Sequence, residues 1–185
     1  MRNGPIETLK IPEFRNLLTG RMFIVIAFRV LATLLGWWVY QLTNDPFSIG
    51  IIGLSEVIPA VTCALYAGHI IDNSEKKKLL ILCCFAYIFL ISLLLIPAFG
   101  SHAFHYSGHQ ITYFIYGVIF FTGIARAFIG PIVPTLIPKI VGVDSLQNAV
   151  TMNQATFLAS SISGHALGGI LIGIIGLDWT IVVVI

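Results

Sequence analysis

Long apolar segments separated by short polar ones make up most of this chain, and the pattern predicts membrane-spanning helices. Five segments reach or exceed the roughly 20 residues that an α-helix needs to cross a bilayer. They lie at about residues 22–42, 48–71, 79–99, 111–137 and 146–176. A sixth apolar run begins at about residue 179 and is too short to span the membrane. We therefore expect five complete helices, the start of a sixth, and a chain that is a fragment.

The composition supports an all-α polytopic membrane protein. Of the 185 residues, 57% are hydrophobic and 10% are charged, and the mean hydropathy is +0.96. Soluble domains usually carry about 25% charged residues, so this chain lacks the polar surface that a soluble protein needs. The lipid bilayer is its expected surrounding, and a net charge of +2 gives no reason to expect a nucleic-acid partner.

The basic residues predict the orientation of the helices. If the N-terminal lead, residues 1–21, lies in the cytoplasm, all Lys and Arg residues of the lead and loops are cytoplasmic. The positive-inside rule therefore predicts a cytoplasmic N-terminus. Within the lead, Pro12 could open a short interfacial helix with Phe14, Leu17 and Leu18 on one side. A solvated tail is the alternative interpretation.

Two ionisable residues lie well inside the predicted spans. Arg29 is about 12 Å from the inner end of the first helix, and Glu56 is about 12 Å from the outer end of the second. In a hydrocarbon core about 30 Å thick their levels differ by only about 6 Å, so we expect the two side chains to pair across a cavity. Glu56 is then a candidate proton or substrate site. The structural alternative is that Arg29 extends to the inner surface and Glu56 is capped or hydrated.

The fifth predicted helix is the most polar one. Asn153, Gln154 and His165 are costly in hydrocarbon and should face a water-filled cavity or a neighbouring helix. For His165 we expect a hydrogen-bonded structural role, with a titratable cavity group as the alternative. Small residues in the same helix, mostly four positions apart, should let helices pack closely: Ser160, Gly164, Gly168, Gly169 and Gly173.

No pattern in the sequence predicts a metal site or covalent chemistry. His102, His105 and His109 are loosely spaced, and no nearby Cys or carboxylate completes a ligand set. The three cysteines fall inside apolar runs and are interpreted as small buried hydrophobic residues. The sequence shows no nucleophile paired with a base and no glycine-rich phosphate loop. We therefore expect no metal, no cofactor and no enzymatic activity.

The polar segment GHIIDNSEKKK, at residues 68–78, resembles the loop between the second and third helices of the major facilitator superfamily. That loop carries a Gly, an Asp four residues later and then basic residues, and four positions match it: Gly68, Asp72, Lys76 and Lys77. Asn73 replaces a usually basic residue. The resemblance implies a gating loop, with Arg126 of the fourth helix as the partner of Asp72. The alternative is a topological turn and a basic anchor.

Further motifs are similar to those of the bacterial enterobactin-exporter-like branch of this superfamily. They are Tyr40 with Thr43, Glu56 with Pro59, and Asn148 with Ala149. The segment GHALGG also resembles an exporter-type motif, with His165 where Pro is usual. The resemblance implies a secondary transporter of the bacterial inner membrane that couples proton movement to the export of small molecules such as drugs or siderophores. It also implies that helices one, two, four and five surround the cavity, while three and six lie outside.

By the same resemblance the chain is the N-terminal half of a transporter, and the missing C-terminal half is an expected partner. Two alternatives stay open. One is a half-size protein that dimerises to complete the pore, and the other is a membrane scaffold that does not transport. The identity of the substrate does not follow from these motifs.

Overall fold

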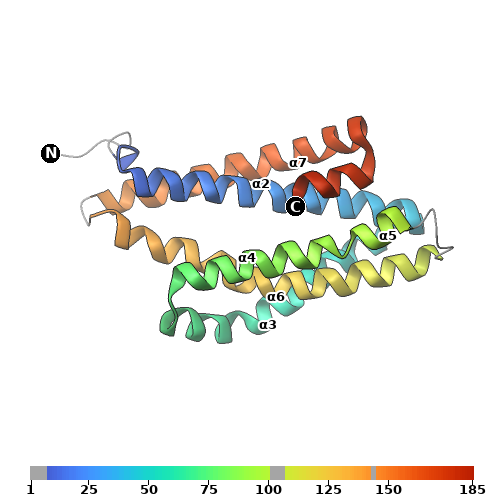
Figure 1. Cartoon of the computed structure of the whole chain (residues 1–185), viewed down its shortest axis with the longest axis horizontal. Helices are drawn as coiled ribbons and strands as arrows, with labels where there is room; N and C mark the ends of the chain where they lie inside the picture. Colours follow the sequence, from blue (N-terminus) through green and yellow to red (C-terminus); the bar gives the residue numbers. More distant parts are fainter. Residues whose placement is uncertain (1–7, 101–106, 143–144) are drawn as a thin grey trace.

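The computed structural model describes residues 8–100, 107–142 and 145–185. Within these ranges the regular structure is helical and no strand occurs. The helices, labelled in Figure 1, are α2 (Pro12–Thr43), α3 (Pro46–Asn73), α4 (Lys76–Ser92), α5 (Leu95–Gly100), α6 (Gly108–Ile140) and α7 (Leu146–Val184). Five helical segments, counting α4 and α5 as one, are long and apolar enough to cross a membrane. The predicted all-α polytopic architecture is confirmed.

The long helices run antiparallel to their neighbours in sequence. In Figure 1, α2, α4 and α7 run in one direction, and α3 and α6 run in the other. The α3–α4 turn, with its lysines, therefore lies at the same end of the bundle as the N-terminus, and the α2–α3 turn lies at the opposite end. Which end faces the cytoplasm stays a prediction from the charge pattern.

The first helix begins earlier than the apolar pattern predicts. α2 starts at Pro12, which occupies the first helical turn, and continues without interruption into the apolar span. Phe14 and Leu18 are buried against Ile137 of α6 and Ala149 of α7. From Pro12 onward, neither of the two alternatives, a separate interfacial helix or a solvated tail, is present, because this stripe packs on protein and extends the span by several turns.

Three prolines in the fourth helix could be expected to interrupt it, but they do not. α6 continues through Pro131, Pro134 and Pro138 to Ile140. A proline removes one helical hydrogen bond, but packing and nearby hydroxyl groups can compensate in a transmembrane helix. Here packing against α3 buries Ala127 and Ile132 of this part of α6.

The third predicted helix consists of two pieces. α4 ends at Ser92, and α5 begins at Leu95. Across the junction, the Leu93 and Leu94 amides donate to carbonyl oxygens three residues earlier, the pattern of a tightened helical turn. Leu94 is fully buried there, so the junction belongs to the packed interior.

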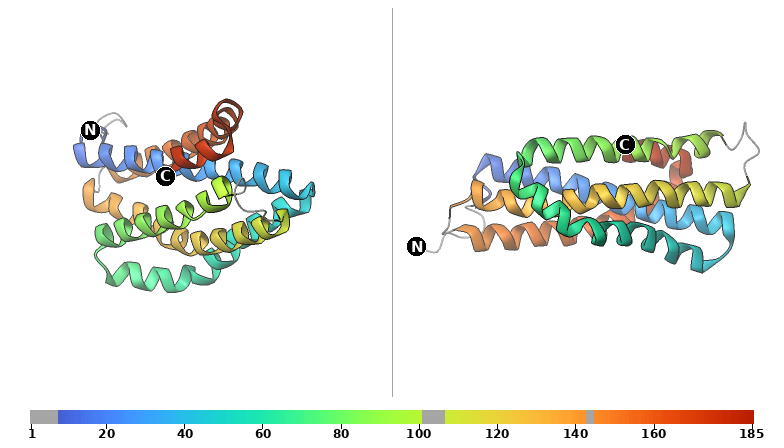
Figure 2. Two further views of the ribbon diagram at one scale, coloured as in Figure 1. Left: turned by 45° about the vertical axis from the view of Figure 1, so that its right-hand side comes forward. Right: turned by 90° about the horizontal axis from the view of Figure 1, so that it is seen from below.

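A reversal at Gly176 ends the fifth span. Gly176 has φ 78° and ψ 178°, a conformation that glycine adopts readily because it has no Cβ. The remaining residues of α7 fold back toward the middle of the bundle (Figure 2). Thr180 and Ile181 are fully buried there, and the ring of Trp179 lies 6.1 Å from that of Phe99. The turn predicted before residue 179 is thus present.

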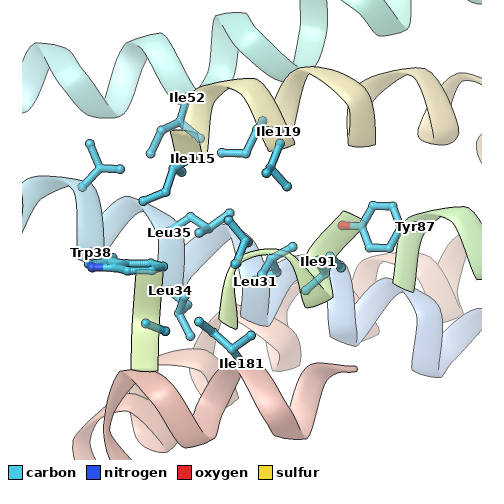
Figure 3. Close-up of a cluster of buried hydrophobic side chains, with 14 of the residues drawn as sticks. Leu31, Leu34, Leu35, Trp38, Ile52, Tyr87, Ile91, Ile115, Ile119 and Ile181 are labelled. Atoms are coloured by element: carbon cyan, nitrogen blue, oxygen red, sulfur yellow. The ribbon is translucent and has the colours of Figure 1, made fainter. Parts of the chain in front are cut away.

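The principal core joins every helix of the bundle. Its central side chains, shown in Figure 3, are Leu31, Leu34, Leu35, Trp38, Ile52, Tyr87, Ile91, Ile115, Ile119 and Ile181. Outside this core, large apolar side chains are open: Leu65 of α3 is 90% exposed, and Ile162 of α7 is 73% exposed. Such a large apolar surface is unfavourable in water, whereas the apolar tails of lipids can cover it.

Candidate functional site

A cavity of about 260 Å³ lies between four of the helices. α2, α3, α6 and α7 all contribute to its wall, whereas α4 contributes nothing, which agrees with the arrangement implied by the family resemblance. The wall contains three arginines and one carboxylate among apolar side chains: Arg21, Ile24, Val25, Phe28, Arg29, Glu56, Arg126, Ile129, Gly130, Val133 and Phe157.

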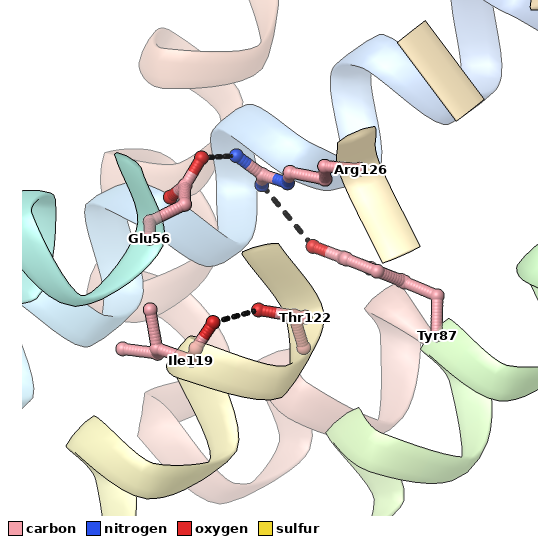
Figure 4. A network of polar contacts seen from close by, with 5 residues as sticks. All are labelled: Glu56, Tyr87, Ile119, Thr122 and Arg126. Atoms are coloured by element: carbon pink, nitrogen blue, oxygen red, sulfur yellow. Dashed lines mark hydrogen bonds and ion pairs between the residues drawn. The ribbon is translucent and has the colours of Figure 1, made fainter. Parts of the chain in front are cut away.

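An ion pair between α3 and α6 dominates one side of this cavity (Figure 4). Arg126 Nη1 donates to Glu56 Oε1, and Arg126 Nη2 donates to Tyr87 Oη at 3.1 Å. The guanidinium carbon also lies 4.3 Å from the centroid of the Phe28 ring, within cation–π range. The Arg126 side chain is 18% exposed and that of Glu56 is 28% exposed. The pair is therefore largely shielded but still reachable from the cavity.

The two pairings predicted for these residues are wrong. Glu56 pairs with Arg126 and not with Arg29, because α3 packs mainly against α6, whereas α2 packs mainly against α7. Arg126 likewise does not reach Asp72, which lies sixteen residues beyond Glu56 on the same helix, about 24 Å away along its axis. Asp72 is exposed and forms no ion pair or hydrogen bond with a residue in the described ranges.

A close approach of α6 to α3 sets the geometry of the ion pair. At Gly123, one turn before Arg126, an added Cβ atom would lie 2.4 Å from the Glu56 carbonyl oxygen and 2.8 Å from Pro59 Cγ. Only glycine fits such a contact between backbones. The sequence analysis missed Gly123, and it placed Tyr87 on a lipid-facing helix. A lone phenol in an otherwise apolar span was the available signal for Tyr87, because a buried hydroxyl needs a partner.

On the other side of the cavity, two arginines of α2 converge on one ring of α7. The guanidinium carbons of Arg21 and Arg29 lie 5.5 Å and 5.8 Å from the centroid of Phe157. Neither arginine forms an ion pair with a described residue. Arg21 Nε is buried and has no hydrogen-bond partner within the described structure. Arg21 was predicted to lie in the cytoplasmic lead, because the pattern did not show that the helix beginning at Pro12 continues into the apolar span.

The small-residue stripe of α7 packs on α2, but it is shorter than predicted. Ser160, Gly164 and Gly168 are buried. An added Cβ atom would lie 2.6 Å from Arg29 Cβ at Gly164 and 3.0 Å from Thr33 Cβ at Gly168. Gly169 and Gly173 have nothing within 4 Å of such an atom, so their predicted packing role is not met in the described structure. They lie on other sides of the helix, at 100° per residue.

The polar residues of α7 face in different directions. Asn153 is 2% exposed, and its Oδ1 atom has no hydrogen-bond partner among the described residues. Gln154 is exposed. A 2.9 Å hydrogen bond joins His165 Nδ1 to Thr33 Oγ1 of α2, so the hydrogen bond expected for His165 is present. Neither Asn153 nor His165 lines the cavity described above.

The residues of the family-like loop cap the end of α3. Lys76 Nζ donates to the Ile71 carbonyl oxygen at 3.1 Å, a contact that suits a cation at a helix C-terminus. Lys77 is exposed. An added Cβ atom at Gly68 would have nothing within 4 Å, so no other backbone approaches it closely. In the part of the chain that the structure describes, this loop makes no contact that identifies a gate.

The chemistry-bearing residues elsewhere form no further site. No group of three or more His, Cys, Asp or Glu within the described ranges could hold a metal ion. His102 and His105 lie outside those ranges. Of the free cysteines, Cys83 is buried, and Cys63 and Cys84 are partly buried in the helices.

The geometry of a polar cavity inside a bundle of apolar helices agrees with the comparison with known families. A major-facilitator family model described as "Transmembrane secretion effector" matches residues 4–184, nearly the whole chain. No curated protein and no solved structure matches it. The chain therefore belongs to this family of membrane transport and secretion proteins of the major facilitator type, as a multi-pass membrane protein.

Proposed function

We propose that this protein is a secondary active transporter that exports a small molecule in exchange for protons. We place it in the enterobactin-exporter-like branch, in the bacterial inner membrane, with its N-terminus in the cytoplasm. One observation carries the proposal: the Glu56–Arg126 ion pair lies in the wall of a cavity between membrane-spanning helices. Charged groups at such positions are expensive and usually serve ion or substrate pathways.

In the proposed mechanism, Glu56 is the proton-accepting group. As a carboxylate it pairs with Arg126, and as a neutral acid it no longer compensates the arginine charge. Removing one charge from a buried pair costs on the order of 3–5 kcal/mol, and the partial exposure of this pair favours the lower end. Moving a two-state equilibrium from 1:99 to 99:1 requires about 5.5 kcal/mol. Proton uptake at Glu56 therefore destabilises the conformation that holds the ion pair by a large part of the free energy that such a shift requires.

We further propose that a second group of helices closes the cavity. Transporters of this type alternate access by rocking two helical halves about a site near the bilayer midplane. The four helices that line the cavity here belong to one half. The closing half would come from the same gene product or from a second copy of this chain, and cross-linking across the cavity would distinguish the two.

The test is export from cells that produce the protein as encoded by its gene. The measurement is the accumulation of a panel of fluorescent organic compounds at external pH 6 to 8, with and without a protonophore. We expect lower accumulation of at least one compound, abolished by the protonophore. Glu56→Gln should abolish the dependence on pH, because glutamine cannot take up a proton. Glu75→Gln should retain it, because Glu75 lies in the exposed α3–α4 turn.

An unchanged pH profile in Glu56→Gln would remove the proton role from this residue. Export that persists with the protonophore would show that protons do not drive the protein. If the wild type exports no compound, the transporter proposal is contradicted and the alternative of a non-transporting membrane scaffold is favoured.

A further inference from the structure

The arginines on the α2 side of the cavity have a charge that no described residue neutralises. Three arginines and one carboxylate line the cavity, and that carboxylate is engaged by Arg126. Arg21 and Arg29 have no acidic partner among the described residues. Two unpaired cations in one cavity repel each other and create a positive potential. An anion that enters the cavity removes this unfavourable arrangement.

The two guanidinium groups converge although their backbones are far apart. Arg21 and Arg29 are eight residues apart on α2, about 12 Å along the helix axis. Each guanidinium carbon nevertheless lies close to the Phe157 ring centroid, at 5.5 Å and 5.8 Å, so the two carbons are at most 5.5 + 5.8 = 11.3 Å apart. Both side chains also line the same cavity, where one ligand can contact both.

The Nε atom of Arg21, like that of Arg126, lacks a hydrogen-bond acceptor among the described residues. Both Nε atoms are buried. Buried donors are almost always paired, with protein, water or a ligand. A carboxylate, sulfonate or phosphate oxygen is the acceptor that best matches an arginine, because two parallel hydrogen bonds can form.

The apolar part of the cavity wall favours a ligand whose uncharged part is also apolar. Apolar side chains from α2 and α6 line the rest of the cavity: Ile24, Val25, Phe28, Ile129 and Val133. The volume of about 260 Å³ is close to the lower end of the roughly 300–1,000 Å³ of small-molecule sites. A flat ring with one acidic group fits both the size and the lining.

We propose that Arg21, Arg29 and Phe157 form a subsite for an organic anion that carries an aromatic ring. The inference deepens the proposed function by naming a substrate class, but it concerns equilibrium binding and needs neither proton coupling nor export. The anionic group contacts the two arginines, whose guanidinium groups lie over Phe157, and the ligand ring lies along the apolar wall. An anionic lipid headgroup offers the same acidic chemistry and is the source that the experiment must separate.

The experiment measures binding of radiolabelled 1-naphthoate to the protein in vesicles of zwitterionic lipid. The reference ligand is 1-naphthylmethylamine, which has the same ring system and the opposite charge. We expect naphthoate to bind and the amine not to compete. Arg21→Gln and Arg29→Gln should each weaken binding about tenfold or more, because each removes a charge-assisted hydrogen-bond donor. Arg29→Lys should restore part of the affinity, which separates lost charge from misfolding.

The matched control is Arg15→Gln, an exposed arginine of α2 that does not line the cavity. Its affinity should equal that of the wild type. Glu56→Gln should strengthen naphthoate binding, because it releases Arg126 into the same cavity. Equal binding of naphthoate and the amine, or equal effects of Arg15→Gln and Arg29→Gln, would overturn the proposal. Naphthoate binding that survives the addition of phosphatidylglycerol supports a soluble anion. Its loss would assign the site to a lipid headgroup and overturn the soluble ligand.

Discussion

The contact at Gly123 gives the sharpest quantitative prediction. A Cβ atom in Gly123→Ala would lie 2.4 Å from the Glu56 carbonyl oxygen, whereas ordinary van der Waals contact begins at 3.4 Å. The difference, 3.4 − 2.4 = 1.0 Å, is the separation that α3 and α6 must gain locally. The neighbouring atom belongs to the backbone, so a change of rotamer cannot relieve the clash. The residues that move apart are those that hold Glu56 and Arg126 together.

The expected loss of stability follows from the cost of overpacking. Forcing an extra methyl group into a packed interior usually costs about 1–3 kcal/mol. For a chain of this size each kcal/mol shifts the melting temperature by roughly 2–4 °C, so Gly123→Ala should melt roughly 2–12 °C lower than a glycine-to-alanine variant without a clash. The higher helix propensity of alanine acts in the opposite direction by about 1 kcal/mol. A control variant measures this effect of helix propensity separately.

The assay is thermal unfolding of the purified protein in detergent, followed by circular dichroism. The control is Gly117→Ala in the same helix, where an added Cβ atom has nothing within 4 Å. Gly117→Ala should leave the melting temperature unchanged or raise it slightly. Equal melting temperatures for Gly123→Ala and Gly117→Ala would show that the close approach of α3 and α6 does not stabilise the bundle. The argument that this approach sets the position of the ion pair would then fail as well.

Two further predictions concern the same interior. Gly164→Ala should lower the melting temperature, because its Cβ atom would lie 2.6 Å from Arg29 Cβ. Gly169→Ala should not lower it, because an added Cβ atom there has nothing within 4 Å. Equal melting temperatures of the two variants would contradict the α2–α7 contact. Tyr87→Phe should cost about 1.5–3 kcal/mol of unfolding free energy, because it removes the hydrogen bond that the Arg126 guanidinium donates. The exposed Tyr66→Phe is its control, and an equal effect of the two substitutions would show that the bond contributes nothing to stability.

Hydropathy alone predicted the number of spans and the location of most turns. Lipid requires every backbone polar group of a span to be satisfied within the helix, so a long apolar run has few other structures available. The turn before residue 179 followed from the same reasoning, and Gly176 supplies it with a backbone conformation open mainly to glycine. The start of α2 did not follow, because Phe14 and Leu18 become part of a core only when α6 and α7 lie beside them.

The partners of the charged residues were decided by the tertiary structure. Residue spacing gives the depth of Arg29, Glu56 and Arg126 in the membrane, but the direction of each side chain depends on which helices pack together. Because α3 packs on α6 and α2 packs on α7, Glu56 meets Arg126 and leaves Arg29 beside Phe157. The sequence by itself therefore determined a membrane bundle with polar groups at certain depths. Only the packing of the helices decided which of those groups neutralise one another and which two arginines keep their charge in the cavity.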